Sequence, residues 1–205
     1  ADSPFMPFSS TKPRMAPPCA SDFAQITNTS RVMMAMAHSV AMLFAARIVD
    51  GRVELRGETA RASARPRLVI VGGDEVSYGA AAPEGRNWKQ VFLDEVKDRI
   101  DLSRVHFVGK VPYDTLVQLL QVSAAHVYLT MPFVLSWSML EAMSLGALVI
   151  GSDTAPVREV IEHGRNGVLV DFFSPAAIAS AVCGALERPA DFSPLRAQAR
   201  ADIVE

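Results

Sequence analysis

The feature that most constrains the fold is a regular alternation of short apolar runs and helical segments after residue 65. The apolar runs lie at residues 67–71, 105–108, 126–130, 147–150 and 168–170. Segments whose apolar residues recur at helical spacing lie at residues 86–100, 113–122, 138–145, 156–162 and 175–187. Strands that are apolar on both faces and alternate with helices indicate a parallel sheet that is covered on both sides. We therefore expect an α/β fold with a single parallel sheet and helices on both faces.

The chain before residue 65 has a different character. Residues 1–30 are rich in Pro, Ser and Thr and predict coil. The apolar stretch from Val32 to Ala46 predicts one helix over about residues 31–48. Its fifteen residues would rise about 22 Å as a helix, short of a hydrocarbon core of about 30 Å. A packed helix is favoured, and a helix lying on a membrane surface is the alternative. Residues 50–65 are polar, with at most a short strand at Arg52–Leu55.

These differences predict a division into three parts. Residues 1–65 form an irregular amino-terminal segment with one apolar helix. Residues 66–190 form the α/β domain, and residues 191–205 form a carboxyl-terminal helical tail.

Composition excludes several classes of protein. The 20 basic and 22 acidic residues give a net charge of −2, which argues against a nucleic-acid partner. Cys19 and Cys183 lie far apart and belong to no CxxC pair, so neither a disulfide framework nor a zinc site is expected. No pair of carboxylates suggests a metal site, and we expect no metal or other cofactor. A cytoplasmic location follows as the default, with peripheral membrane contact as the alternative.

Functional residues are expected where the strands end, because ligands of parallel α/β sheets bind outside the carboxyl ends of the strands. Gly72 and Gly73 follow the first apolar run. Glycines there allow a tight turn and a close approach of the backbone to a ligand. The chain has no GxGxxG pattern at this position, which disfavours a dinucleotide-binding site.

The segment after the third apolar run predicts a helix start with a possible binding role. Ser136 or Ser138 is suited to cap the helix, whose amino terminus offers N–H groups and partial positive charge to a phosphate. Glu141 lies about one turn further on, and its carboxylate is able to accept hydrogen bonds from two ribose hydroxyls. The alternative is purely structural: Ser136 caps the helix, and Glu141 occupies its first turns. Spacing alone leaves both interpretations open.

Taken together, four stretches of this chain resemble a known family. They are LVIVGGDE, RVHFVGKVPYDTL, SAAHVYLTMPFVLSWSMLEAMSLGALVIGSDTAPVREVI and EHGRNGVLVDFFSPAAIASAV, which cover about residues 67–187. They resemble the carboxyl-terminal half of a family 4 glycosyltransferase, the group 1 retaining enzymes with the GT-B fold. The resemblance implies a Rossmann-like domain that binds a nucleotide-sugar. It also implies transfer of the sugar to an acceptor hydroxyl with retention and without a metal.

The resemblance assigns roles to particular residues. The loop that embraces the nucleotide base in this family matches Gly109, Lys110 and Val111. The helix-start loop, which lends backbone N–H groups to the diphosphate, matches Ser136 and Trp137 and leads into Ser138. The second Glu of the family's Glu-x7-Glu motif binds the ribose hydroxyls and matches Glu141.

The sequence also departs from the family pattern. The first Glu of the Glu-x7-Glu motif is Phe133 here, and two positions where the family usually has Gly are Val134 and Ser136. A full enzyme of the family is about twice this length, so the resemblance implies a separate acceptor-binding domain or chain as a partner. Two functions therefore stand as hypotheses: the donor-binding half of a glycosyltransferase, or a truncated, inactive module that binds a sugar nucleotide or a partner.

Overall fold

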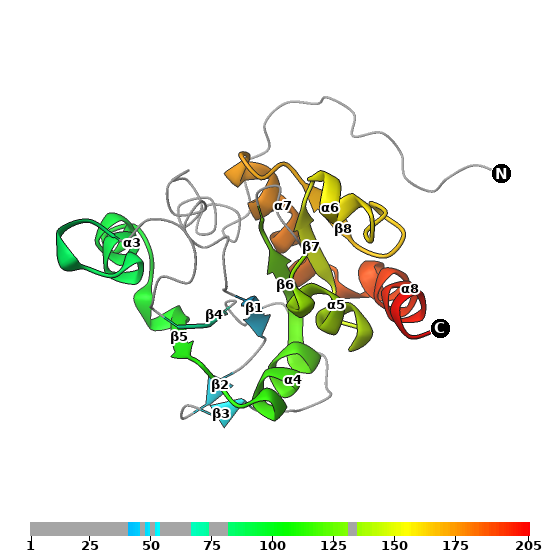
Figure 1. Cartoon of the computed structure of the whole chain (residues 1–205), viewed down its shortest axis with the longest axis horizontal. Helices are drawn as coiled ribbons and strands as arrows, with labels where there is room; N and C mark the ends of the chain where they lie inside the picture. Colours follow the sequence, from blue (N-terminus) through cyan, green and yellow to red (C-terminus); the bar gives the residue numbers. More distant parts are fainter. Residues whose placement is uncertain (1–40, 46–47, 50–51, 54–66, 74–81, 131–134) are drawn as a thin grey trace.

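A computed structural model (Figure 1) describes residues 41–45, 48–49, 52–53, 67–73, 82–130 and 135–205. The strands are β1 (Ala41–Ala45), β2 (Ile48–Val49), β3 (Arg52–Val53), β4 (Arg67–Val71), β5 (Val105–Gly109), β6 (Ser123–Tyr128), β7 (Val149–Ser152) and β8 (Val168–Val170). The α-helices are α3 (Trp88–Val96), α4 (Tyr113–Val122), α5 (Trp137–Ser144), α6 (Ala155–Arg158), α7 (Pro175–Glu187) and α8 (Ser193–Val204). Short 3-10 turns occupy Pro83–Gly85, Leu102–Arg104 and Pro189–Phe192.

Six of the strands form one sheet, in the order β5-β4-β1-β6-β7-β8. The pairs β4–β5, β6–β7 and β7–β8 are parallel, as the sequence predicts. Within this sheet the order corresponds to 3-2-1-4-5-6, the order of a doubly wound Rossmann sheet. The central strand β1 is the exception, because it runs antiparallel to both of its neighbours. The predicted α/β class is confirmed, and the sheet is parallel everywhere except at β1.

The helix predicted over residues 31–48 is wrong at residues 41–45, which form β1. Ala41 pairs with Val71 of β4, and Met42 pairs with Val127 of β6, so β1 has a partner on each side. A short, wholly apolar run fits a buried strand as well as a helix, and hydrophobic spacing alone does not separate the two. The sheet therefore includes a strand that precedes residue 66. Residues 1–40, with the predicted coil and most of the predicted helix, lie outside the described residues.

Two apolar layers cover the faces of the sheet. On one face, strand residues such as Ile70, Val127 and Ile150 pack with α7 in one buried cluster. On the other face, Val69, Tyr128 and Val149 pack with α4 and α5 in a second cluster. The alternation follows from the strand period of two, which sends successive side chains to opposite faces. Helix α8 supplies a buried side chain to each cluster, Leu195 to the first and Ala199 to the second.

The ends of several elements differ from the prediction for local reasons. Helix α3 begins at Trp88 because the Asn87 side chain accepts the Gln90 N–H, and the Gln90 side chain accepts the Asn87 N–H. Helix α6 ends at Arg158, four residues before its predicted end at 162. The backbone beyond it turns toward the buried side chain of Asn166, as described below. Strand β6 begins at Ser123 and β7 at Val149, so both strands are shifted by two or three residues from the predicted runs.

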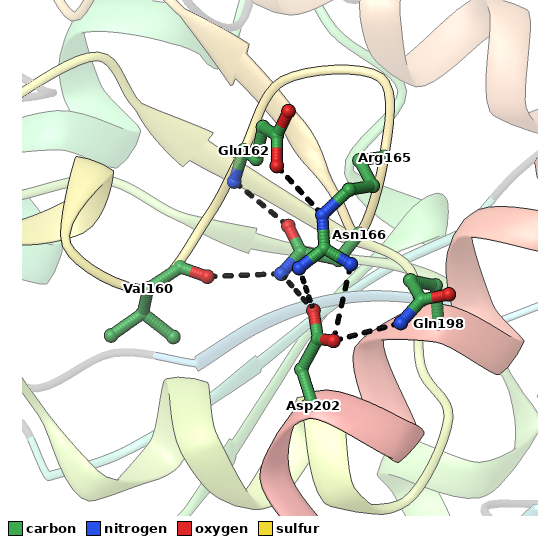
Figure 2. A network of polar contacts seen from close by, with 6 residues as sticks. All are labelled: Val160, Glu162, Arg165, Asn166, Gln198 and Asp202. Atoms are coloured by element: carbon green, nitrogen blue, oxygen red, sulfur yellow. Dashed lines mark hydrogen bonds and ion pairs between the residues drawn. The ribbon is translucent and has the colours of Figure 1, made fainter.

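Asn166 is the centre of a polar network that ties the loop after α6 to helix α8 (Figure 2). Its side chain is almost completely buried, with the residue 2% exposed. Its Nδ2 donates to the Val160 carbonyl at 3.0 Å and to Asp202 Oδ2 at 2.6 Å, and its Oδ1 accepts the Glu162 N–H at 2.8 Å. Arg165 donates two bonds to the Asp202 carboxylate, at 3.1 and 2.8 Å. Every bond links a loop residue to another loop residue or to α8.

Two arginines of α8 attach this helix to α4 and α5 as well. Arg196 donates to the carbonyls of Ser123 and Ala124, where α4 ends and β6 begins. Arg200, one turn further on, donates to the carbonyl of Ser144 at the end of α5. Cations at helix carboxyl ends are favoured because unpaired carbonyls carry partial negative charge there. Helix α8 is thus fixed to both α4 and α5, the helices that cover one face of the sheet.

We expect the stability that Asp202 contributes to the fold to depend on pH. Hydrogen bonds from Gln198, and then from Asn166, hold the pKa of the Asp202 carboxyl below its ordinary value of 3.8. A lowered folded-state pKa means that the stabilisation is complete above the unfolded-state pKa and is lost as pH falls through the folded-state pKa. The parent should therefore be more stable than Asp202→Asn above about pH 5. Its advantage should shrink below about pH 4.

Urea unfolding between pH 2.5 and 7 measures this difference. Asp98→Asn serves as the control, because Asp98 is exposed and lies outside the network. The account of the network is contradicted if the advantage over Asp202→Asn is the same at pH 3 and pH 7.

Candidate functional site

The residues predicted to bind a ligand follow the carboxyl ends of parallel strands. At the ends of β4 and β5, the Gly72 N–H donates to the Gly109 carbonyl at 3.0 Å. A Cβ atom on Gly73 would lie 2.8 Å from Lys110 Cε, so the backbone of Gly73 and the side chain of Lys110 are in contact. Gly109 has a φ of 69°, a backbone angle that residues other than glycine rarely adopt. The structure therefore brings these four predicted residues together at one corner of the sheet edge.

Val111 contributes to the site differently from its neighbours. Its side chain is partly buried and packs against the cluster on the α4 and α5 face of the sheet.

A second group of predicted residues lies at the start of α5, after the end of β6. Ser136 is the N-cap of this helix, and its Oγ accepts the Ser138 N–H at 3.3 Å. The two hydroxyl groups of Ser136 and Ser138 are 3.0 Å apart. Trp137 is 79% exposed. Glu141, one turn into the helix, is half-buried. The structure thus confirms Ser136 as the cap of this helix, and it places the two hydroxyl groups together at the helix start.

Strand β1 separates the two groups of residues. Because β4 and β6 both pair with β1, their ends lie two strand spacings apart, roughly 10 Å. The order of the strands reverses direction beside β1, and such a switch point is where open α/β sheets bind ligands. Phe133, the residue in place of the family's first Glu, lies outside the described residues.

The structure also shows two hydroxyl groups at this edge that the sequence pattern does not indicate. The Tyr128 hydroxyl accepts the Ser136 N–H at 2.9 Å. The Ser152 hydroxyl accepts the Thr130 N–H at 3.0 Å and donates to the Thr130 carbonyl at 2.8 Å. Tyr128, Thr130 and Ser152 are all buried. The only sequence signal for them is the position of hydroxyl-bearing residues near the ends of two apolar runs.

An ion pair lies beyond the end of β7 at the same edge. Arg158 donates to both carboxylate oxygens of Asp153, at 2.5 and 2.8 Å. The hydrogen bond from Arg158 is the main cause that lowers the pKa of Asp153, and the positive charge of Arg158 acts in the same direction. Because the Asp153 carboxylate already neutralises the charge of Arg158, we do not assign Arg158 a role in binding an anionic ligand.

Neither a metal centre nor a membrane span is found among the described residues. No group of three or more His, Cys, Asp or Glu side chains in this part of the chain is arranged to hold a metal ion. Among the same residues, no helix combines the length and the apolar character needed to span a membrane.

Comparison with known proteins identifies the family. Residues 39–188 match the profile of the family described as "Glycosyl transferases group 1". The chain therefore belongs to the group 1 glycosyltransferases. The match begins two residues before β1, so β1 is part of the region that carries the family likeness. A search of curated protein sequences gives no match.

Solved structures of similar fold are GT-B glycosyltransferases. Anabaena HepE in complex with UDP-glucose is 20% identical, with a TM-score of 0.52 over 65% of this chain and 34% of that chain. Sucrose-phosphate synthase from Thermosynechococcus elongatus is 25% identical, with a TM-score of 0.53 over 66% of this chain and 33% of that chain. The matched part of this chain thus spans about a third of the length of these proteins.

Proposed function

We propose that this chain is the carboxyl-terminal, donor-binding half of a family 4 glycosyltransferase. Such an enzyme would transfer a sugar from a nucleotide-sugar to an acceptor hydroxyl with retention. The observation that carries the proposal is the shared sheet edge. The Gly72–Gly109 contact and the Ser136-capped start of α5 both follow carboxyl ends of parallel strands, on either side of the switch point. The family match supports a nucleotide-sugar as the ligand, and so do the complexes of HepE with UDP and UDP-glucose.

We assign the nucleotide base and ribose to residues on both sides of the switch point. The backbone of Gly109, Lys110 and Val111 would contact the base, and the lack of a side chain at Gly72 would allow a ligand to approach closely. At Gly73 the same lack makes room for the side chain of Lys110. The Glu141 carboxylate would accept hydrogen bonds from both ribose hydroxyls, since an ionised carboxylate is a pure acceptor.

We assign the diphosphate to the start of α5. The hydroxyls of Ser136 and Ser138 and the N–H of Trp137 would donate to the phosphate oxygens. The Ser138 N–H already donates to Ser136 Oγ. The first N–H groups of a helix lack partners within the helix and carry partial positive charge, which favours anions. These fixed dipoles would also stabilise the charge that develops on the departing diphosphate during transfer. The proposal requires no metal ion and places the acceptor on a separate domain or chain.

A second function is favoured by one residue, Phe133. A phenyl ring in place of a carboxylate removes an acceptor that would contact the donor sugar. The alternative is therefore a module that binds the sugar nucleotide but does not catalyse transfer. Release of nucleoside diphosphate from a panel of nucleotide-sugars, measured with and without an acceptor-binding half, separates the two functions. Binding without release in both conditions supports the inactive module.

Restoring the missing carboxylate is a direct test of the Phe133 argument. We expect Phe133→Glu to raise any residual rate of sugar transfer or donor hydrolysis, because it returns a hydrogen-bond acceptor for the donor sugar. Phe133→Leu is the control, since it removes the ring without adding an acceptor. If Phe133→Glu is no faster than Phe133→Leu, the loss of activity lies elsewhere in the site or in the partner domain.

A further inference from the structure

We infer that Tyr128 is a positioning residue for the diphosphate-binding start of α5, a role that rests on the proposed function of this edge. The hydroxyl of Tyr128 and the backbone N–H of Ser136 are 2.9 Å apart, with the hydroxyl as acceptor. The two residues are eight positions apart in the sequence and belong to different elements, the last residue of β6 and the N-cap of α5. The bond therefore fixes the position of the helix start relative to the sheet.

The phenol is held firmly enough to act as a fixed point. Tyr128 is 8% exposed and belongs to the buried cluster on the α5 face of the sheet, together with Val69, Met139 and Val149. Its backbone pairs with Gly151 of β7. A ring confined on several sides has little freedom to move, so its hydroxyl has a defined place at the sheet edge.

The end of β6 is fixed by a second hydroxyl. Ser152 Oγ contacts both the N–H and the carbonyl of Thr130, at 3.0 and 2.8 Å. Thr130 and Ser136 are thus each tied to a buried side chain of the sheet. This arrangement sets where the chain leaves β6 and where α5 begins, independently of any ligand.

The Tyr128 bond also divides the donors at the helix start into two kinds. The Ser136 N–H donates to the phenol oxygen, and the Ser138 N–H donates to Ser136 Oγ. The diphosphate would therefore meet the hydroxyls of Ser136 and Ser138 and the Trp137 N–H. The bond of Tyr128 is made to the backbone at the N-cap of α5. Tyr128 therefore acts on the phosphate through the placement of α5, and not on the ribose, which the proposed function assigns to Glu141.

This division gives a test that a general loss of stability would not reproduce. Tyr128→Phe keeps the ring and removes only the hydroxyl. We expect its affinity for a nucleoside diphosphate to fall by about three- to tenfold, the usual effect of one lost hydrogen bond. Its affinity for the matching nucleoside, which lacks phosphate, should stay within about twofold of the parent. The melting temperature should fall by only a few degrees, since Ser136 is exposed and its N–H is able to bind water.

The experiment uses the full chain with UDP, ADP and GDP, and then the nucleoside of the diphosphate that binds best. Isothermal titration measures the diphosphate, and NMR titration measures the weaker nucleoside. Tyr113→Phe is the matched control, because it removes the same atom from a tyrosine that is 61% exposed at the start of α4. We expect this control to bind both ligands as the parent does.

The possible outcomes separate the inference from the function on which it rests. If the parent and Tyr128→Phe bind the diphosphate equally, or if the variant loses diphosphate and nucleoside affinity in equal measure, the positioning role is wrong and the proposed function stands. If the parent binds none of the three diphosphates, the proposed function fails, and the role of Tyr128 fails with it.

Discussion

Replacing Glu141 with alanine should weaken nucleoside diphosphate binding by roughly ten- to a hundredfold. The proposed pair of hydrogen bonds from ribose hydroxyls to a carboxylate is charge-assisted, and such bonds contribute about 1.5–3 kcal/mol. Glu141 is half-buried on α5 and is not a member of either buried cluster. The variant should therefore keep the stability of the parent while it loses affinity.

Two further variants make the Glu141 result specific. Glu141→Gln keeps the shape and one acceptor oxygen, so it should lose less affinity than the alanine variant. Glu187→Ala removes the same charge from the exposed end of α7 and should bind as the parent does. Isothermal titration and thermal unfolding measure both quantities. If Glu141→Ala binds as tightly as the parent and melts several degrees lower, Glu141 is structural and its assignment to the ribose is wrong.

Asn166→Ala should have the opposite pattern, with a large loss of stability and little loss of binding. The substitution leaves the Val160 carbonyl and the Glu162 N–H without their partner in the network, whereas Asp202 Oδ2 keeps the bond from Arg165. A buried polar group without a hydrogen bond costs about 1–3 kcal/mol. We expect a total loss of roughly 2–4 kcal/mol in the free energy of unfolding. The loss is limited because exposed parts of the network are able to bind water instead.

Gln198→Ala is the control for the Asn166 variant. Gln198 donates a single hydrogen bond to Asp202, at 2.8 Å, from the outer side of the same network. Its loss should cost less than about 1.5 kcal/mol, because this bond is exposed and water is able to replace it at the carboxylate. Chemical denaturation measures both variants. Equal stability losses would mean that the buried Asn166 side chain does not hold the loop to α8.

The part of the fold that the sequence predicted best is the part buried on both faces. Parallel strands such as β4 and β7 carry apolar residues at successive positions, and this pattern is typical of a parallel sheet when helices lie between the runs. Strand β1 could not be predicted in the same way. Its apolar run belongs to a longer apolar stretch from Val32 to Ala46 that only His38 and Ser39 interrupt, and no Gly or Pro marks where a strand begins.

The candidate site could be predicted only where a residue's own chemistry indicates its role. A glycine after a strand and a serine before a helix have local meanings, so Gly73 and Ser136 could be proposed from their own chemistry. Gly109 was proposed only from the family resemblance. The contacts of Tyr128 with Ser136 and of Ser152 with Thr130 join residues of different elements. Such contacts depend on how the chain packs in three dimensions, and neither residue type is restricted enough to indicate them from the sequence.

The central claim, that the carboxyl edge of this sheet binds a nucleoside diphosphate, is tested most directly by thermal unfolding of the full chain with UDP, ADP or GDP. A ligand that binds only the native state stabilises it by about 2.7 kcal/mol at 100 times its Kd. We predict that at least one of the three raises the melting temperature by roughly 5–10 °C at that concentration. We also predict that Glu141→Ala needs a roughly ten- to a hundredfold higher concentration of the same ligand for the same rise. No rise with any of the three at millimolar concentration would contradict the claim.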